Sequence, residues 1–181
     1  MPKVDRNGQA LVLTPTQLDE LWTELKHPHR LITQICYYTA ARVGEVCSLQ
    51  AQDVIGSEII YRARNTKTDT TRTIAIARPL AQILTSTSLP TTGYLFPGKY
   101  KGSITTQSVD LALRQACDYL GFKGVSTHSF RRSLLTHLYR AGHSLRTLQQ
   151  ISGHSDIGNL ARYLDCDRDE ATKALMSFWN Q

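Results

Sequence analysis

Apolar residues recur every three or four positions along most of the chain, the spacing that places them on one face of an α-helix. The first helix is predicted to begin at Pro15, because Thr14 and Gln17 have the form of a capping box and Leu18 and Leu21 follow at helical spacing. The same spacing predicts further helices over residues 31–39, 43–49, 80–84, 109–120, 130–139, 145–152 and 157–164, and a last one from residue 169.

Residues 53–76 have a different pattern, which is typical of β-strands. The segments "VIGSEIIYRAR" and "RTIAIA" are rich in branched side chains, and the polar run "NTKTDTT" separates them. We expect a small antiparallel sheet of two to three strands here, and a loop over residues 89–103. The chain of 181 residues, of which 41% are hydrophobic, is long enough for one core. These features predict a single α+β domain over residues 1–181, mostly helical with a small antiparallel sheet.

The balance of charge favours a polyanionic partner. The formal net charge is +6 and the isoelectric point is about 9.3, and cationic side chains near phosphates gain affinity from counterion release. Each basic segment taken alone is more typical of a solvated surface. The basic residues concentrate in two groups, one with Arg62, Arg64, Lys67, Arg72 and Arg78, the other with Lys123, Arg131, Arg132, Arg140 and Arg146.

Several other kinds of protein and site are disfavoured. The sequence contains neither a run of eighteen apolar residues nor a signal peptide, so a soluble cytoplasmic protein is expected. The four cysteines form no C-x-x-C pair, which argues against a zinc site. Residues 93–99 have the spacing of a phosphate-binding P-loop without its Ser or Thr, and residues 165–170 lack the glycine of a calcium-binding loop. We therefore expect no metal, no cofactor and no membrane partner.

The segment "THSFRR" is the first candidate for chemistry. His128 and Arg131 are three residues apart in a predicted first helical turn, so they share one helical face. Phe130, Leu134 and Leu138 form the opposite, core-facing stripe. The histidine and the arginine are therefore expected to be left free by packing and to point at one target, although a surface pair on an ordinary helix is the simpler interpretation of this segment alone.

Further motifs turn this pair into a longer series. The segments "TAARVGEVCSL", "NTKT", "THSFRR" and "SGH", with the tyrosine nine residues after the last histidine, supply in order Arg42, Lys67, His128, Arg131, His154 and Tyr163. This series resembles the catalytic set of the tyrosine recombinases, the phage integrase family, and the likeness extends from about residue 13 to residue 165. The sequence departs from the commoner family pattern at Ala40, where glycine is frequent, at Arg132, where histidine is, and at Ser152, where leucine is.

The resemblance implies the fold and the activity of a tyrosine recombinase catalytic domain. Such an enzyme is a DNA strand transferase, a site-specific recombinase or integrase that cleaves and rejoins strands through a 3′-phosphotyrosyl intermediate without a metal. In these terms Tyr163 is the expected nucleophile, His128 the proton acceptor, and Lys67 the acid that protonates the departing 5′-oxygen. Typical members carry a separate N-terminal domain that clamps DNA, and we expect this chain to lack it, either as an excised catalytic domain or as a minimal recombinase.

The chemistry explains why cationic side chains are needed. Negative charge develops on the phosphate oxygens during attack, and without a metal it must be met by fixed donors. Arg42 and Arg131 are expected to form this clamp, because a guanidinium is permanently charged and donates two parallel hydrogen bonds, and His154 is the expected third donor. Glu45 lies three residues after Arg42 and is expected to hold it in position, with a simple surface ion pair as the equal alternative.

Double-stranded DNA is the expected partner. Recombination requires two duplexes and four active sites, so assembly as a tetramer on two DNA sites is expected, with a monomer in isolation. The C-terminal segment, with Leu175, Phe178 and Trp179, is expected to pack either on its own chain or on a neighbouring protomer. Contacts to the DNA backbone are expected from Arg62, Arg64, Arg72 and Arg132.

Three alternatives stay open at this point. Ile157, Leu160 and Leu164 form a helical stripe beside Tyr163, so a core aromatic is the better interpretation of that tyrosine taken alone. A relaxase of the type IB topoisomerase kind would share the chemistry without joining two duplexes. A non-catalytic DNA-binding regulator would use the basic groups alone.

Overall fold

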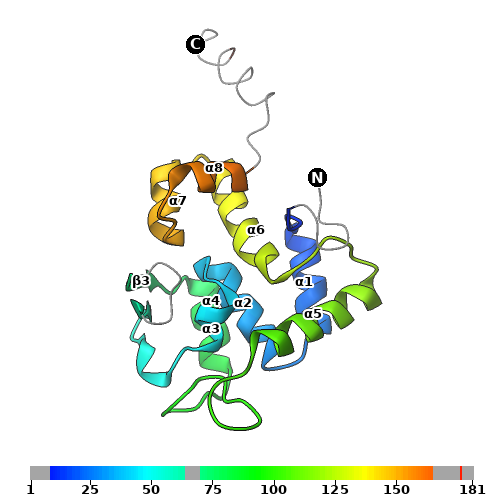
Figure 1. Cartoon of the computed structure of the whole chain (residues 1–181), viewed down its shortest axis with the longest axis vertical. Coiled ribbons are helices and arrows are strands. Elements are labelled where there is room, and N and C mark those ends of the chain that lie inside the picture. The colour runs from blue at the N-terminus through cyan, green and yellow to red at the C-terminus, as the bar shows by residue number, and fades with distance from the viewer. Residues whose placement is uncertain (1–8, 64–69, 165–175, 177–181) are drawn as a thin grey trace.

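The computed structural model describes residues 9–63, 70–164 and 176, and for residues 162 and 163 it describes the backbone alone. Within these residues the fold is mostly helical with one small sheet, as predicted (Figure 1). The helices are α1 (Pro15–Glu24), α2 (His29–Thr39), α3 (Val43–Cys47), α4 (Arg78–Ser86), α5 (Thr106–Leu120), α6 (Thr127–Arg140), α7 (Leu145–Ser152) and α8 (Ile157–Tyr163). The predicted helix from residue 169 lies outside the described residues, apart from Met176.

The sheet has three antiparallel strands in the order β1 (Val54–Ile55), β2 (Glu58–Tyr61) and β3 (Arg72–Ala75), so the prediction of two to three strands is confirmed. The short 3-10 turn η1 (Ala51–Asp53) leads into β1. The register pairs Tyr61 at the end of β2 with Arg72 at the start of β3. Residues 64–69, which include Arg64 and Lys67, connect these two strand ends and lie outside the described residues.

Local side-chain chemistry sets several of the helix ends. The capping box at α1 is present as predicted, because the Thr14 hydroxyl accepts a hydrogen bond from the Gln17 backbone N–H. Gly153 ends α7 with a φ of 66°, a left-handed conformation that glycine adopts without steric cost. The Asp156 carboxylate then accepts a hydrogen bond of 2.8 Å from the Gly158 N–H and begins α8.

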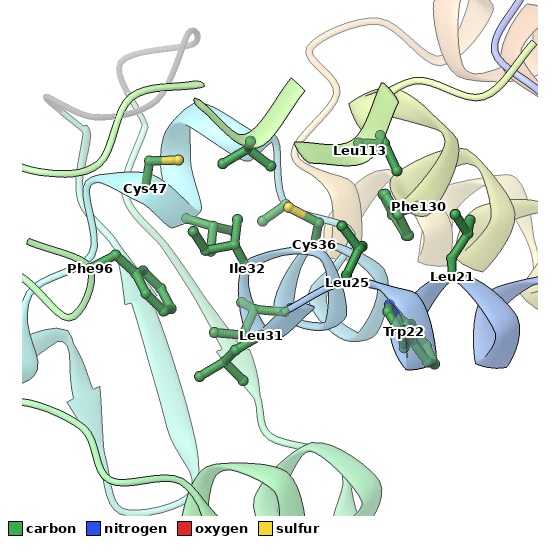
Figure 2. Packing of buried hydrophobic residues seen from close by; sticks show 14 of the residues in the cluster. Leu21, Trp22, Leu25, Leu31, Ile32, Cys36, Cys47, Phe96, Leu113 and Phe130 are labelled. Atoms are coloured by element: carbon green, nitrogen blue, oxygen red, sulfur yellow. The ribbon is translucent and has the colours of Figure 1, made fainter. Parts of the chain in front are cut away.

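The interior is divided into a large and a small cluster of buried apolar side chains. Figure 2 shows part of the large cluster, in which Trp22, Leu31, Cys36, Phe96 and Phe130 pack between α1, α2, α3, α5 and α6. The helix α6 contacts both α2 and α7, and α7 contacts α8 (Figure 1). The small cluster joins α6, α7 and α8. It consists of Ala40, Leu135, Leu148, Leu160 and Leu164.

Among the described residues, no helix combines the length and the apolar character that crossing a bilayer requires.

Candidate active site

Arg131 lies in the second turn of α6 and is buried, with 2% of its surface exposed. Its Nη1 donates to the Ala40 carbonyl oxygen, and its Nη2 donates to the Ser152 carbonyl oxygen at 2.9 Å. The expectation that packing leaves this arginine free is therefore wrong. The guanidinium is held in place by two backbone carbonyls, one at the end of α2 and the other at the end of α7.

Ala40 holds its carbonyl in an unusual backbone conformation. It ends α2 in the left-handed region with a φ of 51°, and it is fully buried. For a residue with a Cβ atom this conformation costs roughly 1–2 kcal/mol, which explains why glycine is the easier choice at such a position. The fold accepts the cost where the end of α2 meets Arg131.

Glu45 joins two arginines in a buried cluster. Only 2% of the Glu45 side chain is exposed, so the alternative of a surface ion pair is excluded. Its Oε2 accepts from the Arg42 backbone N–H at 2.8 Å, and its Oε1 accepts from the Arg42 Nη1 at 3.1 Å. Burial is the largest influence on the Glu45 pKa and raises it, but Arg72 and Arg42 together outweigh burial and hold the pKa below its ordinary value.

Arg72, which the sequence placed among the expected DNA contacts, is the second partner of this carboxylate. Its Nη1 and Nη2 donate to the two carboxylate oxygens of Glu45 at 3.2 and 2.8 Å, and 10% of its side chain is exposed. The guanidinium lies over the Tyr61 ring, 4.6 Å from the ring centroid. A Cβ atom on Gly153 would lie 3.3 Å from the Arg72 Nη1, so the chain turn before His154 packs directly on this arginine.

His154 follows this turn and contacts both Arg131 and Ser152. The Arg131 Nη2 lies 3.3 Å from each ring nitrogen of His154, and the Ser152 hydroxyl lies 2.7 Å from its Nδ1. Burial is the largest cause that lowers the pKa of His154 to about 4. The positive charges of Arg131, Arg42 and Arg72 add to this lowering, whereas the Glu45 carboxylate opposes it. The imidazole is therefore neutral at pH 7 in the absence of DNA.

The other predicted residues differ in how far the structure describes them. His128 lies in the first turn of α6 and is exposed, so it does not share the burial of Arg131. Tyr163 is the last residue of α8, and the buried Leu160 and Leu164 anchor this helix to α6 and α7. The side chain of Tyr163 and the whole of Lys67 and Arg64 lie outside what the structure describes.

Two further assignments concern arginines expected to contact the DNA backbone. Arg132 is 4% exposed and its Nη1 donates to the Ala10 carbonyl, so it ties the N-terminal segment to α6. Arg62 donates its Nε to the buried Asp53 carboxylate while 38% of its side chain stays exposed. Its guanidinium is thus oriented from one side and accessible from the other.

The structure therefore brings four of the predicted residues together, namely Arg42, Glu45, Arg131 and His154. Sequence reasoning missed the inward role of Arg72 and the contacts of Ser152. The unusual serine at position 152 was visible, but its partners depend on the tertiary fold. In the part of the chain that the structure describes, no group of three or more His, Cys, Asp or Glu side chains is arranged to hold a metal ion.

Comparisons with known proteins agree with this architecture. The integrase of Escherichia phage P2 is 30% identical over 149 residues, which cover 80% of this chain and 40% of that protein. The solved catalytic domain of bacteriophage HP1 integrase is 28% identical with a TM-score of 0.67, and the match covers 93% of this chain and 95% of that domain. A Tn1549 transposon integrase solved with transposon right end DNA has a TM-score of 0.77 at 18% identity, over 98% of this chain and 69% of that one.

The chain spans about half the length of the curated relatives it matches first, between 40% and 63% of each. The solved HP1 domain, by contrast, is matched over nearly its whole length. The fold is thus that of a tyrosine recombinase catalytic domain. The family description "Phage integrase family" matches residues 12–170, which is most of the chain, and the protein belongs to the phage integrase family of tyrosine recombinases.

Proposed function

We propose that this chain is the catalytic domain of a site-specific DNA recombinase, in which Arg42, Arg131 and His154 bind the scissile phosphate. The observation that carries the proposal is a cluster in which the guanidiniums of Arg42 and Arg72 bind the buried Glu45 carboxylate, while the Arg131 guanidinium contacts the His154 imidazole, on which all four charges act. One carboxylate does not neutralise three guanidiniums, so the cluster keeps positive charge in a largely buried place. A phosphodiester is an anion whose oxygens accept hydrogen bonds from these donors.

The positive cluster matches what the transition state requires. Charge grows on the phosphate oxygens during attack, and donors that are already oriented stabilise it without reorganisation. Arg131 is oriented by the carbonyl oxygens of Ala40 and Ser152, and Arg42 is oriented by the Glu45 carboxylate. Loss of one such donor slows comparable enzymes by about 10²–10³-fold, and we expect an effect of this size for either arginine.

We assign the remaining chemical roles to Tyr163, Lys67 and His128, as the family membership implies. Tyr163 attacks the phosphorus and forms the 3′-phosphotyrosyl bond, while the 5′-oxygen leaves with a proton from Lys67. His128 accepts the phenolic proton, which an unperturbed tyrosine with a pKa of about 10 rarely loses at pH 7. One phosphodiester is exchanged for another, so no ATP is consumed and a strand with a free 5′-hydroxyl reverses the step.

Double-stranded DNA is the partner in this proposal. The solved Tn1549 integrase, which shares the fold, is bound to transposon end DNA. Arg62 and Arg64 are the proposed contacts to the DNA backbone, while Arg72 and Arg132 are left out because their guanidiniums bind inside the protein. We propose that the protein acts on DNA in the cytoplasm and that residues 1–181 form a single catalytic domain.

The nucleophile is tested with a suicide substrate that carries a nick next to the scissile phosphate. We expect a denaturation-resistant protein–DNA adduct in the presence of a chelator, and we expect Tyr163→Phe to abolish the adduct while DNA binding persists. Tyr119→Phe is the matched control, because Tyr119 is 78% exposed on α5. Absence of an adduct with the unchanged protein, in the presence of binding, would favour the DNA-binding regulator.

Assembly is tested separately from cleavage. We propose that four chains assemble on two DNA sites and that the C-terminal segment contributes to the assembly by docking on a neighbouring protomer. Light scattering on DNA is measured with and without the last dozen residues. Identical assembly of the two forms would contradict docking in trans. Relaxation of a plasmid without any joining of two duplexes would favour the topoisomerase-like alternative.

A further inference from the structure

Ser152 contacts both Arg131 and His154. It is fully buried at the last position of α7, and its carbonyl oxygen accepts from the Arg131 Nη2 at 2.9 Å. Its hydroxyl oxygen lies 2.7 Å from the His154 Nδ1 and also 2.7 Å from the Leu148 carbonyl oxygen. The side chain of one serine thus connects the imidazole to the backbone of α7.

The polarity of these contacts determines where the protons lie. A serine hydroxyl carries one proton, and the Leu148 carbonyl can only accept, so the hydroxyl donates to Leu148. The hydroxyl oxygen then accepts from His154, which places a proton on the Nδ1. In a neutral imidazole the Nε2 is then without a proton and accepts from Arg131, which can only donate.

The opposite assignment satisfies fewer groups. If the serine hydroxyl donated to the His154 Nδ1, the Leu148 carbonyl would lose its hydrogen bond from the serine hydroxyl. The serine hydroxyl oxygen and the Leu148 carbonyl oxygen, 2.7 Å apart, would then face each other with no proton between them. A buried polar contact with unmatched polarity is costly, so the first assignment is favoured.

The charged groups around the imidazole keep it neutral. Arg131 faces it from α6, Arg72 from β3, and Arg42 from the start of α3. Among the described residues, Glu45 of α3 is a carboxylate whose charge acts on it in the opposite sense. Burial and the excess of positive charge both oppose a further proton, and together they lower the pKa of His154 to about 4.

We propose that Ser152 is a positioning residue that holds neutral His154 with its proton on Nδ1, so that Nε2 donates to the scissile phosphate only after His154 has taken up a proton from solvent. The bound phosphate supplies the negative charge that favours this uptake. No bond to carbon or phosphorus changes in the step, and one proton moves from water to Nε2. The position of the proton on Nδ1 follows from the contacts of Ser152, and the donation to phosphate rests on the proposed function.

The position of the proton is tested by NMR of the DNA-free protein with nitrogen-labelled histidine. At pH 7 we expect the His154 Nδ1 to carry the proton and Nε2 to be free of it, with His154→Asn used to assign the signals. Ser152→Ala is expected to shift His154 towards the other tautomer, and Ser152→Thr to restore the original one. Ser155→Ala is the matched control, because Ser155 is exposed beside His154.

The outcomes of this experiment are clearly separated. A proton on Nε2 in the unchanged protein would overturn the inference. An unchanged tautomer in Ser152→Ala would overturn the role of the serine. The measurement on the unchanged protein requires no variant to fold, so the inference stays testable even if Ser152→Thr is too large for the buried site.

The proton uptake is tested by the pH profile of single-turnover cleavage on the nicked substrate. The rate is expected to fall as the pH rises through the pKa of phosphate-bound His154. The serine hydroxyl binds an imidazolium more strongly than a neutral imidazole, so Ser152→Ala is expected to move the midpoint by about one pH unit towards acid. Ser155→Ala is expected to leave the midpoint unchanged.

Failure of this second test is distinguishable from failure of the proposed function. If the unchanged protein forms no adduct at any pH, the proposed function fails, and the NMR measurement still decides the tautomer. If the adduct forms and the midpoint is the same with Ser152→Ala, the proposed function stands and the coupling through Ser152 is wrong.

Discussion

Replacement of Glu45 by glutamine is the most informative test of the buried cluster. The carboxylate accepts four hydrogen bonds, two from Arg42 and two from Arg72, at distances between 2.8 and 3.2 Å. Glutamine keeps the shape of the side chain but replaces one acceptor oxygen by an NH₂ group. Donors of the arginines then face a donor, and the positive charges of both guanidiniums lose their counter-charge.

The size of the effect follows from these contacts. Two of the four bonds lose their acceptor, and at about 1.5 kcal/mol for each bond to a charged group the loss is about 3 kcal/mol. Removal of one partner from a buried ion pair costs about 3–5 kcal/mol. The lower end applies here because 25% of the Arg42 side chain is exposed and water partly replaces the lost acceptor. We expect the free energy of unfolding at pH 7 to fall by about 3 kcal/mol.

The pH dependence gives the prediction a second, independent readout. The folded state lowers the pKa of Glu45 below its ordinary value of 4.5, so the stabilisation is complete above that pH. It is lost as the pH falls through the folded pKa, where the native carboxylate takes up a proton. The difference between Glu45→Gln and the unchanged protein is therefore constant from pH 7 to about pH 5 and shrinks in more acidic solution.

Urea denaturation across this pH range measures both quantities. Glu24→Gln is the matched control, because Glu24 is exposed at the end of α1, and no loss is expected for it. A loss below about 1 kcal/mol for Glu45→Gln at pH 7 would mean that the carboxylate stabilises no more than a surface ion pair does, and it would refute the reasoning. A difference that stays constant down to the lowest pH at which the protein folds would refute it as well.

Two further substitutions test the support of the site. Gly153→Ala and Gly142→Ala both place a Cβ at a positive φ, of 66° and 91°, at a cost of roughly 1–2 kcal/mol. Gly153→Ala is expected to lower the free energy of unfolding more than Gly142→Ala does, because a Cβ at position 153 would contact Arg72 whereas a Cβ at position 142 would not. Equal losses in urea denaturation would contradict this packing. Asp53→Asn removes the negative charge of a side chain that is 1% exposed and pairs with Arg62. We expect the free energy of unfolding, measured by urea denaturation, to fall by about 2 kcal/mol. An unchanged denaturation midpoint would contradict a structural role for this pair.

Hydrophobic spacing was sufficient to predict most of the fold because nearly every helix has one buried face. The predicted range 145–152 agrees with α7 at both ends, since Ser144 caps the helix start and Gly153 ends it. The helix predicted over 43–49 ends earlier, at Cys47, although Leu49 is buried. Leu49 follows the helix, and its carbonyl oxygen accepts from the Leu95 N–H. Such a contact between distant segments leaves no periodic signal in the sequence.

The site was predicted only in part. The order of the motifs along the chain identifies which residues belong to the site, but it does not show what surrounds each side chain. The spacing of His128 and Arg131 predicts one shared face, but the same spacing does not reveal that Arg131 is buried between two distant carbonyls. A charged residue in an amphipathic helix is by default assigned to the solvent side. The ion pair of Arg72 was missed for the same reason, since strand alternation cannot show that Glu45 lies opposite its side chain.

The two ways of holding arginine in this site have different electrostatic consequences. A carboxylate, such as Glu45 between Arg42 and Arg72, orients a guanidinium but also cancels charge. Arg131 is oriented by carbonyls at the ends of α2 and α7, where the last carbonyl groups of a helix lack intrahelical partners and carry the negative end of its dipole. Such dipoles fix the guanidinium without a full counter-charge, so Arg131 keeps most of its charge for an anion, and its buried position strengthens that attraction.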